Sequence, residues 1–292
     1  MFHFILSSLL CTLLLATNVA AQPVQVVLGA SPGGFAHRYA ADLLPLISKA
    51  AGKPAVIDFR PGAAGQVAAK HVLSKKSSEI TILLGTAHKW ENAEVSQLDL
   101  LPIAYLGTSP AVIVTRPNDK YQTYAEFLEY SKTHKTSYGT VASSPNSHYF
   151  HIASEGTLAT DVPYKSGGAV LADVLGGHVD IGITVVDAVA DLITQGKLIP
   201  LGILGKARTV EIPNALPLFR QGISVPHEER YFNNVFLWVN PSADKHAVEK
   251  FRMNLLKQLA TREARDIFYN RGIQFNSRQP KDAQTFLTYL IK

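Results

Sequence analysis

Short apolar stretches alternate with amphipathic ones along most of the chain. Val24 to Leu28 reads VQVVL, which predicts a buried strand, and Ser31 to Gly34 then predicts a tight turn. After the turn, apolar residues recur at helical spacing, at Ala36, Ala40, Leu43, Leu44 and Ile47. We therefore expect a strand, a glycine turn and a helix in direct succession, with Ser31 as the N-cap and Pro32 as the first helical residue.

The glycine turn is suited to anion binding. Gly33 and Gly34 have no Cβ, so a ligand can approach the backbone closely. The free N–H groups at the start of a helix and the helix dipole both favour a negative charge there. Such turns also occur in α/β proteins that bind nothing at them, so the turn alone does not decide between a site and a structural connection.

The same alternation continues through two units. In the first, Pro54 to Phe59 and Ile80 to Leu84 predict strands, with a helix over Gln66 to Ser74 between them. In the second, we expect helices over 124–132, from 145, over 168–175 and over 188–195, and strands at 137–141, 162–164, 179–186 and 199–204. Ser144 is the expected N-cap of the helix from Pro145, so the second unit repeats the arrangement of strand, Ser-Pro turn and helix.

Two extended stretches, Leu101 to Thr115 and Tyr231 to Val239, are long enough to pass between the units, and a helix follows Pro241. We expect an α/β fold of two lobes, each a mainly parallel sheet flanked by helices. Residues 22–105 and 225–292 would form the first lobe and residues 106–224 the second. In such sheets ligands lie beyond the carboxyl ends of the strands.

The first 21 residues differ from the rest. Phe4 to Leu15 is almost wholly apolar, and Val19 to Ala21 resembles a signal-peptidase site before Gln22, although no Lys or Arg precedes Phe4. We expect a signal peptide over residues 1–21 and a mature protein in the periplasm. The one cysteine, Cys11, lies within this segment, so the mature chain would form no disulfide.

The net charge of +5 and a pI near 9.1 raise the question of nucleic-acid binding. The Lys and Arg residues are scattered, however, and no run is longer than Lys75-Lys76. This distribution indicates a solvated basic surface rather than a nucleic-acid partner. After Ala21 no apolar stretch approaches the length that spans a membrane.

An ordered series of short motifs resembles the tripartite tricarboxylate transporter substrate-binding family, also called Bug receptors. The motifs are Pro32-Gly33-Gly34, Arg60 to Gly65 (RPGAAG), Leu83 to Thr86 (LLGT), Tyr138-Gly139-Thr140, Val162 to Lys165 (VPYK), Leu175 to Asp180 (LGGHVD) and Gly196-Lys197-Leu198. The resemblance implies the type II periplasmic binding protein fold, with a ligand cleft between two lobes. It also implies a monomeric receptor that takes a small carboxylate or amino-acid-like ligand to membrane permease subunits. The alternative is a sensor or degenerate receptor of the same fold that signals to a sensor ectodomain without transport.

The resemblance places the ligand on two loops, Pro32 to His37 and Ala142 to His148. Two helix N-termini can hold a carboxylate with fixed amide donors and no buried cation. The expected ligand-binding residues are Pro32, Gly33, Gly34, Phe35, His37, Thr86, Ala142, Ser143, Ser144, Asn146, Ser147, His148, Tyr164, Lys165 and Asp187. For the last three, plainer roles remain open: Tyr164 in packing, Lys165 in solvent and Asp187 as a helix cap.

The sequence departs from the family at both loops. His37 stands where most members have Asp, and Pro145, which has no amide proton, stands where members have Ser or Thr. His37 would either remove a negative charge from the pocket, favouring a more anionic ligand, or face solvent on the first helical turn. Ser143, Ser144 or Asn146 would have to supply the donor that Pro145 lacks.

Two other classes of site are possible from the spacing of residues. His148, His151 and Glu155 lie on one helix face and are the candidate metal ligands, while Ser143 or Ser144 near His148 is the candidate nucleophile with its base. Neither set is complete, because the first lacks a diagnostic ligand pattern and the second has no evident orienting acid. We therefore expect no metal, no cofactor and no enzymatic activity.

Overall fold

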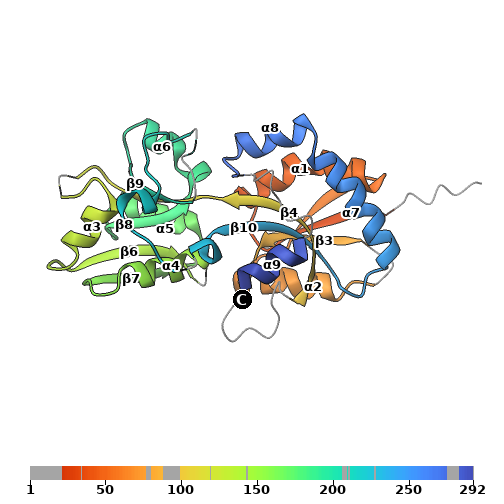
Figure 1. Cartoon of the computed structure of the whole chain (residues 1–292), viewed down its shortest axis with the longest axis horizontal. Helices are drawn as coiled ribbons and strands as arrows, with labels where there is room; N and C mark the ends of the chain where they lie inside the picture. The colour runs from red at the N-terminus through yellow and green to blue at the C-terminus, as the bar shows by residue number, and fades with distance from the viewer. Residues whose placement is uncertain are drawn as a thin grey trace, which may run out of the picture.

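The computed structural model describes residues 22–33, 35–76, 80–87, 99–118, 120–142, 144–205, 209, 211–226, 228–274 and 283–291 (Figure 1). The predicted signal peptide, Gly34 and Ser143 lie outside these residues. Two lobes lie side by side along the long axis of the molecule, and each contains one five-stranded sheet (Figure 1).

The first lobe contains the N-terminal and C-terminal parts of the chain. Its sheet has the strand order β2-β1-β3-β10-β4. Its elements are β1 (Val24–Leu28), α1 (Phe35–Ala51), β2 (Ala55–Phe59), η1 (Ala63–Gly65), α2 (Gln66–Leu73), β3 (Thr81–Thr86), β4 (Leu101–Ser109), β10 (Asn233–Val239), α7 (Lys245–Leu259), α8 (Arg262–Asn270) and α9 (Ala283–Ile291).

The second lobe is formed by the middle of the chain and has the strand order β7-β6-β8-β5-β9. Its elements are β5 (Ala111–Thr115), α3 (Tyr124–Tyr130), β6 (Thr136–Val141), α4 (Pro145–Ala153), β7 (Ala159–Tyr164), α5 (Gly167–Gly176), β8 (Ile181–Val185), η3 (Val186–Ala188), α6 (Ala190–Thr194), β9 (Ile199–Leu204) and η4 (Leu218–Gln221). The segment η5 (Glu228–Tyr231) precedes the return of the chain to β10.

Each sheet is mixed rather than wholly parallel. In the first sheet β1 pairs with β2 and β3 in parallel, and β10 pairs antiparallel with both β3 and β4. In the second sheet β6 is parallel to β7 and β8, and β5 is antiparallel to both β8 and β9. One strand in each sheet therefore runs against the other four, as the prediction of mainly parallel sheets requires.

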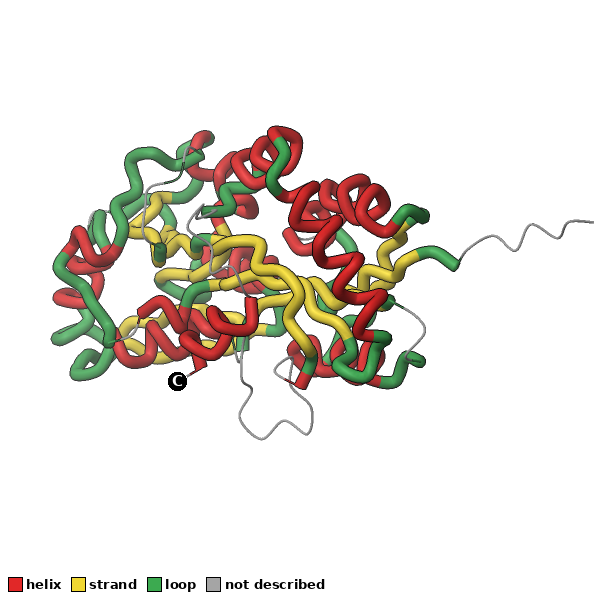
Figure 2. The backbone as a smooth tube through the Cα atoms, turned by 45° about the vertical axis from the view of Figure 1, so that its right-hand side comes forward, coloured by secondary structure: helices red, strands yellow, loops and turns green. Residues whose placement is uncertain are grey.

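Figure 2 shows the helices arranged around the strands of both lobes. Each sheet contributes strand residues to two hydrophobic clusters that contain different helices, so its strands are apolar on both faces. Along β1, Val24, Val26 and Leu28 pack in one cluster with α1, α7 and α8. Val27 points the other way, into a cluster with α2, β10 and α9. This division explains why VQVVL reads as nearly continuous apolar sequence instead of strict alternation.

The sequence placed most elements within a few residues of their observed bounds. Ser144 caps α4 by accepting a hydrogen bond from the Ser147 N–H, as predicted. The expected start of the first helix at Pro32 is wrong, because α1 begins at Phe35 and Gly33 has φ +93°, which is not helical. The helix expected over 188–195 is also divided, into η3 and the short α6.

Among the described residues, no helix is both long enough and apolar enough to cross a membrane.

Candidate ligand-binding site

The predicted site residues follow the carboxyl ends of parallel strands in both lobes. Pro32 and Gly33 follow β1, and Thr86 ends β3. In the second lobe, Ala142 and Ser144 follow β6, Tyr164 ends β7, and Asp187 lies in η3 directly after β8. The sheet topology thus places these residues where ligands bind in open α/β sheets.

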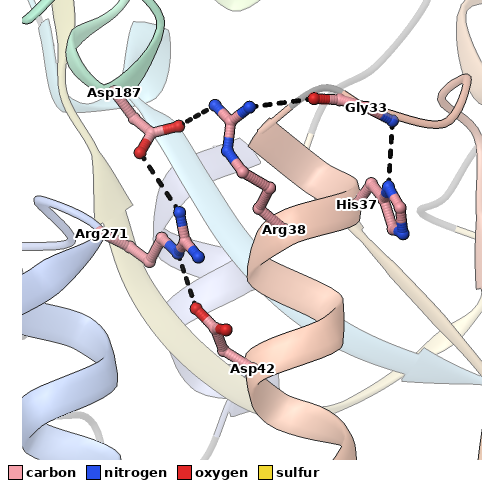
Figure 3. A network of polar contacts seen from close by, with 6 residues as sticks. All are labelled: Gly33, His37, Arg38, Asp42, Asp187 and Arg271. Atoms are coloured by element: carbon pink, nitrogen blue, oxygen red, sulfur yellow. Dashed lines mark hydrogen bonds and ion pairs between the residues drawn. The ribbon is translucent and has the colours of Figure 1, made fainter. Parts of the chain in front are cut away.

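The turn before α1 is closed by hydrogen bonds from two side chains of that helix (Figure 3). The Gly33 N–H donates to His37 Nδ1 at 2.9 Å. The Gly33 carbonyl oxygen accepts from Arg38 Nη1, also at 2.9 Å. The Gly33 amide, which the sequence suggested was free for an anion, is therefore occupied by the side chain of His37.

His37 has two contacts that the sequence did not predict. Its ring meets the Phe59 ring edge to face, with centroids 4.9 Å apart. Because Nδ1 accepts a hydrogen bond, the neutral ring carries its proton on Nε2. His37 thus stabilises the turn and packs against β2, and it is not simply a solvent-facing residue.

A chain of ion pairs joins the two lobes beside this turn (Figure 3). Arg38 of α1 pairs with Asp187 of the second lobe through Nη2 and Oδ2. Arg271, just after α8, has Nη1 3.4 Å from Asp187 Oδ1 and Nε 2.6 Å from Asp42 Oδ2. Asp187 therefore receives two guanidinium groups from the opposite lobe.

The surroundings of these charges differ. The Asp187 side chain is 17% exposed and that of Arg38 is 41% exposed. The hydrogen bond from Arg271 to Asp42 raises the pKa of Arg271, and the negative charges of Asp42 and Asp187 act in the same direction. Asp187 does not cap the following helix, since α6 has Val189 as its N-cap with no side-chain hydrogen bond.

The loop after β6 forms a second local group. The Ser144 hydroxyl accepts from the Ser147 N–H at 3.3 Å, and the Ser147 hydroxyl donates to the Ser144 carbonyl at 2.8 Å. Asn146, in the first turn of α4, is buried, and its Oδ1 has no hydrogen-bond partner in the described part of the chain. A buried acceptor of this kind is expected to bind a ligand donor or a water molecule.

The remaining predicted residues are variously placed. The Tyr164 hydroxyl donates to Asp173 Oδ2 at 2.6 Å, so its polar end is engaged within the second lobe. Burial, together with Asp173, raises the pKa of Tyr164 to about 12. Lys165 and His148 are exposed, Phe35 and Thr86 are partly buried, and Pro32 is exposed.

Three charged residues of the inter-lobe chain were missed from the sequence: Arg38, Asp42 and Arg271. Arg38 and Asp42 are one helical turn apart on α1, a spacing that was visible. Arg271 lies 84 residues from Asp187, and no local pattern connects the two. At this boundary two arginines meet one carboxylate, that of Asp187.

The described residues contain no group of three His, Cys, Asp or Glu side chains placed to hold a metal ion. His151 and Glu155 are both exposed on or just after α4.

Comparison with known proteins identifies the family of this chain. The profile described as "Tripartite tricarboxylate transporter family receptor" matches residues 39–288. Protein BugT of Bordetella pertussis is 27% identical over 215 residues, which is 68% of this chain and 65% of BugT. The chain thus matches slightly less than two thirds of that relative's length.

Solved structures agree over nearly the whole chain. The periplasmic binding protein BugD has a TM-score of 0.73 at 19% identity, covering 92% of this chain and 93% of BugD. MatC from Rhodopseudomonas palustris with bound malate has a TM-score of 0.76 at 17% identity, covering 92% of this chain and 95% of MatC. The R. palustris protein Rpa4515 with adipate has a TM-score of 0.79 at 19% identity, covering 94% of this chain and 95% of Rpa4515.

At these identities the likeness shows the fold, which is that of the type II periplasmic binding proteins. The fold alone does not show to which family the chain belongs. The family profile does, because it matches most of the chain. The chain belongs to the tripartite tricarboxylate transporter receptor family, whose members bind solutes and are not enzymes.

Proposed function

We propose that this protein is an extracytoplasmic receptor that binds a small carboxylate between its two lobes and delivers it to a tripartite tricarboxylate-type permease. Two relatives of the same fold were solved with malate and with adipate, both dicarboxylates. A dicarboxylate is therefore the ligand class that we propose for this chain.

One observation supports this proposal above the others. Arg38 bonds the Gly33 carbonyl in the loop after β1 and pairs with Asp187 in the loop after β8. The carboxyl ends of strands from both lobes thus meet at a boundary that carries two guanidinium groups. Guanidinium groups bind carboxylates with paired, charge-assisted hydrogen bonds, which suits a receptor for organic anions.

The residues expected from the sequence to contact the ligand remain part of this proposal. Of these, Gly33, His37 and Asp187 belong to the inter-lobe boundary or touch a residue that does. The buried Asn146 Oδ1 has no hydrogen-bond partner among the described residues, and a hydroxyl or amine of the ligand can donate to it. A hydroxylated dicarboxylate such as malate would use both features.

The proposal includes export and the division into lobes. Cleavage after Ala21 would release a periplasmic protein that begins at Gln22, and N-terminal sequencing of the exported protein tests this directly. In this proposal the lobes meet near the two extended crossings, between β4 and β5 and before β10. We propose that the receptor acts as a monomer and closes about these crossings when it binds its ligand.

Thermal unfolding against a panel of mono-, di- and tricarboxylates and amino acids tests the ligand class. A solute that binds only the folded state raises the unfolding midpoint by an amount set by its concentration relative to Kd. We expect dicarboxylates to raise the midpoint, and alcohols of the same chain length to leave it unchanged. If no carboxylate shifts the midpoint of a ligand-free sample, the dicarboxylate proposal is wrong and a signalling or degenerate receptor is favoured instead.

A further inference from the structure

We propose that Arg38 is the group of the first lobe that holds a ligand carboxylate, and that Asp187 competes with the ligand for it. This inference rests on the proposed function, a receptor for small carboxylates, and names the residue that determines its specificity. The sequence did not single out Arg38, and it predicted that Asp187 contacts the ligand directly.

The Gly33 amide already has a hydrogen-bond partner within the first lobe. A glycine turn that opens a helix holds an anion through its free N–H groups. Here the Gly33 N–H donates to His37 Nδ1 at 2.9 Å, so a ligand can take this donor only by displacing His37. The turn therefore lacks one of the amide donors that its sequence suggests.

Arg38 supplies a stronger donor at the same place. Its Nη1 is fixed by the Gly33 carbonyl, which orients the guanidinium across the mouth of the turn toward the second lobe (Figure 3). Its side chain is 41% exposed, so an incoming anion can reach it. A guanidinium fixed on one side and open on another is well prepared to bind a carboxylate.

Arg271 is held differently. Its Nε is bound to Asp42 at 2.6 Å, and its side chain is only 21% exposed. The pair that it forms with Asp42 lies wholly within the first lobe and remains when the lobes separate. Arg38 instead pairs, among the described residues, with one carboxylate, Asp187, which belongs to the opposite lobe. Separation of the lobes leaves the charge of Arg38 unneutralised.

The consequence is an exchange of ion pairs. A ligand carboxylate that binds Arg38 replaces Asp187 as its partner. The free energy of ligand binding is therefore reduced by the free energy of the Arg38–Asp187 ion pair that is broken. Removal of the Asp187 charge should then tighten anion binding, and removal of the Arg38 charge should weaken it. If Asp187 instead accepted a ligand donor or drove closure, its removal would weaken binding.

Calorimetric titration with malate and with adipate distinguishes these cases. We would compare the wild-type protein with Arg38→Gln, Arg38→Lys, Asp187→Asn and Lys49→Gln. Lys49 is the matched control, because it lies on α1, forms an exposed ion pair with Glu263 at 2.7 Å and loses the same charge. Unfolding midpoints of all variants would show that each is folded.

We expect Arg38→Gln to weaken binding of at least one of these dicarboxylates by about tenfold or more, the usual range for a hydrogen bond to a charged group. Arg38→Lys should retain part of the affinity, since it keeps the charge but loses the paired donors. Asp187→Asn should bind severalfold more tightly, and Lys49→Gln should stay within about twofold of wild type because exposed pairs contribute little.

The failure of this inference can be told apart from failure of the proposed function. Suppose that the wild-type protein binds a dicarboxylate. An unchanged affinity in Arg38→Gln, or a weaker affinity in Asp187→Asn, would then overturn the role of Arg38 and leave the receptor proposal standing. Binding by Asp187→Asn alone would support the competition. If neither dicarboxylate binds any of the five proteins, both the dicarboxylate class and this inference are wrong.

Discussion

The Tyr105 hydroxyl of β4 donates a hydrogen bond to Asn234 Oδ1 of β10, with the two oxygens 3.2 Å apart. The same Oδ1 accepts from the Thr108 hydroxyl at 3.0 Å, and the hydroxyls of Tyr105 and Thr108 are 2.8 Å apart. All three side chains are buried, in the two strands through which the first sheet continues toward the second lobe. This network joins the two crossings on the side of the first lobe.

Replacement of the shared acceptor should destabilise the protein. Asn234→Ala removes an acceptor of two hydroxyl groups and leaves a small cavity, so we expect a loss of about 1–3 kcal/mol in the free energy of unfolding. Urea unfolding measures it. The control is Asn233→Ala, one residue earlier and only partly buried, for which we expect about 0.5 kcal/mol or less. Equal losses in the two variants would show that the network adds nothing.

Gly107 provides a second test of the same crossing. It has φ +114°, and a Cβ there would lie 2.6 Å from Ile273 Cγ2 and 3.0 Å from the Gln274 carbonyl oxygen. Gly107→Ala should therefore lower the free energy of unfolding by at least about 2 kcal/mol, through backbone strain and overpacking together.

A second glycine separates the two contributions. Gly156 has φ +80° but open space around its Cβ position, so Gly156→Ala carries only the backbone strain, about 1–2 kcal/mol. Both variants can be compared by urea unfolding under one set of conditions. A Gly107→Ala variant no less stable than Gly156→Ala would mean that the close approach of residues 273 and 274 to β4 is absent in solution.

The parts of the fold that depend on neighbouring residues were predictable from the sequence. The N-cap of α4 at Ser144 and the left-handed C-cap of α5 at Gly177 each involve residues within one turn of the chain. The repeated succession of strand, turn and helix likewise predicted two α/β lobes. By contrast, the start of α1 was misplaced, because Ser31 and Pro32 suit a helix start as well as the turn that they occupy.

The candidate site was only partly predictable, for a physical reason. The ends of parallel strands can be inferred from local pattern, which identified the turn at Gly33 and the strand end at Asp187. The pairing of Asp187 with Arg38 depends on how two lobes are oriented, and residues 149 positions apart carry no local sign of it. The side chain that occupies the Gly33 amide was equally hidden, because it depends on the rotamer of His37.

His71 of α2 predicts a pH dependence of stability. Burial lowers the pKa of His71, Arg60 and Lys75 lower it further, and Asp58 raises it. Its Nε2 lies 3.3 Å from Asp58 Oδ2 but makes no hydrogen bond among the described residues. The folded protein therefore binds this proton less well than the unfolded chain does, and stability falls as the pH drops below the unfolded value of about 6.5.

The His71→Gln variant cannot take up this proton. We therefore expect it to lose less unfolding free energy than wild type between pH 7.5 and the folded-state pKa of His71, which urea unfolding at a series of pH values would measure. His246→Gln, on the exposed surface of α7, is the control and should keep the wild-type pH dependence. A His71→Gln profile that coincides with wild type would show that protonation of His71 does not affect folding.

Asn146 should separate stability from binding. Its buried Oδ1 has no hydrogen-bond partner in the described part of the chain, so folding already bears the cost of taking that oxygen out of water. Asn146→Leu removes the cost, and we expect the free energy of unfolding without ligand to stay within about 1 kcal/mol of wild type or to rise. If Asn146 binds the ligand, the same variant should weaken binding of the dicarboxylate found in the thermal screen by about tenfold.

Asn240 is the matched control, since it is equally buried but fully bonded. Its Nδ2 donates to the Leu73 carbonyl at 2.8 Å and to the Lys75 carbonyl at 3.1 Å, and its Oδ1 accepts from the N–H and hydroxyl of Ser242. Asn240→Leu leaves those partners unsatisfied and should cost about 2–5 kcal/mol with little change in ligand affinity. Urea unfolding and calorimetry on both variants give the two quantities. A ligand contact at Asn146 predicts that Asn146→Leu loses less stability than Asn240→Leu but more ligand affinity. A large loss of stability in Asn146→Leu with unchanged affinity would instead assign Asn146 to the fold and remove it from the site.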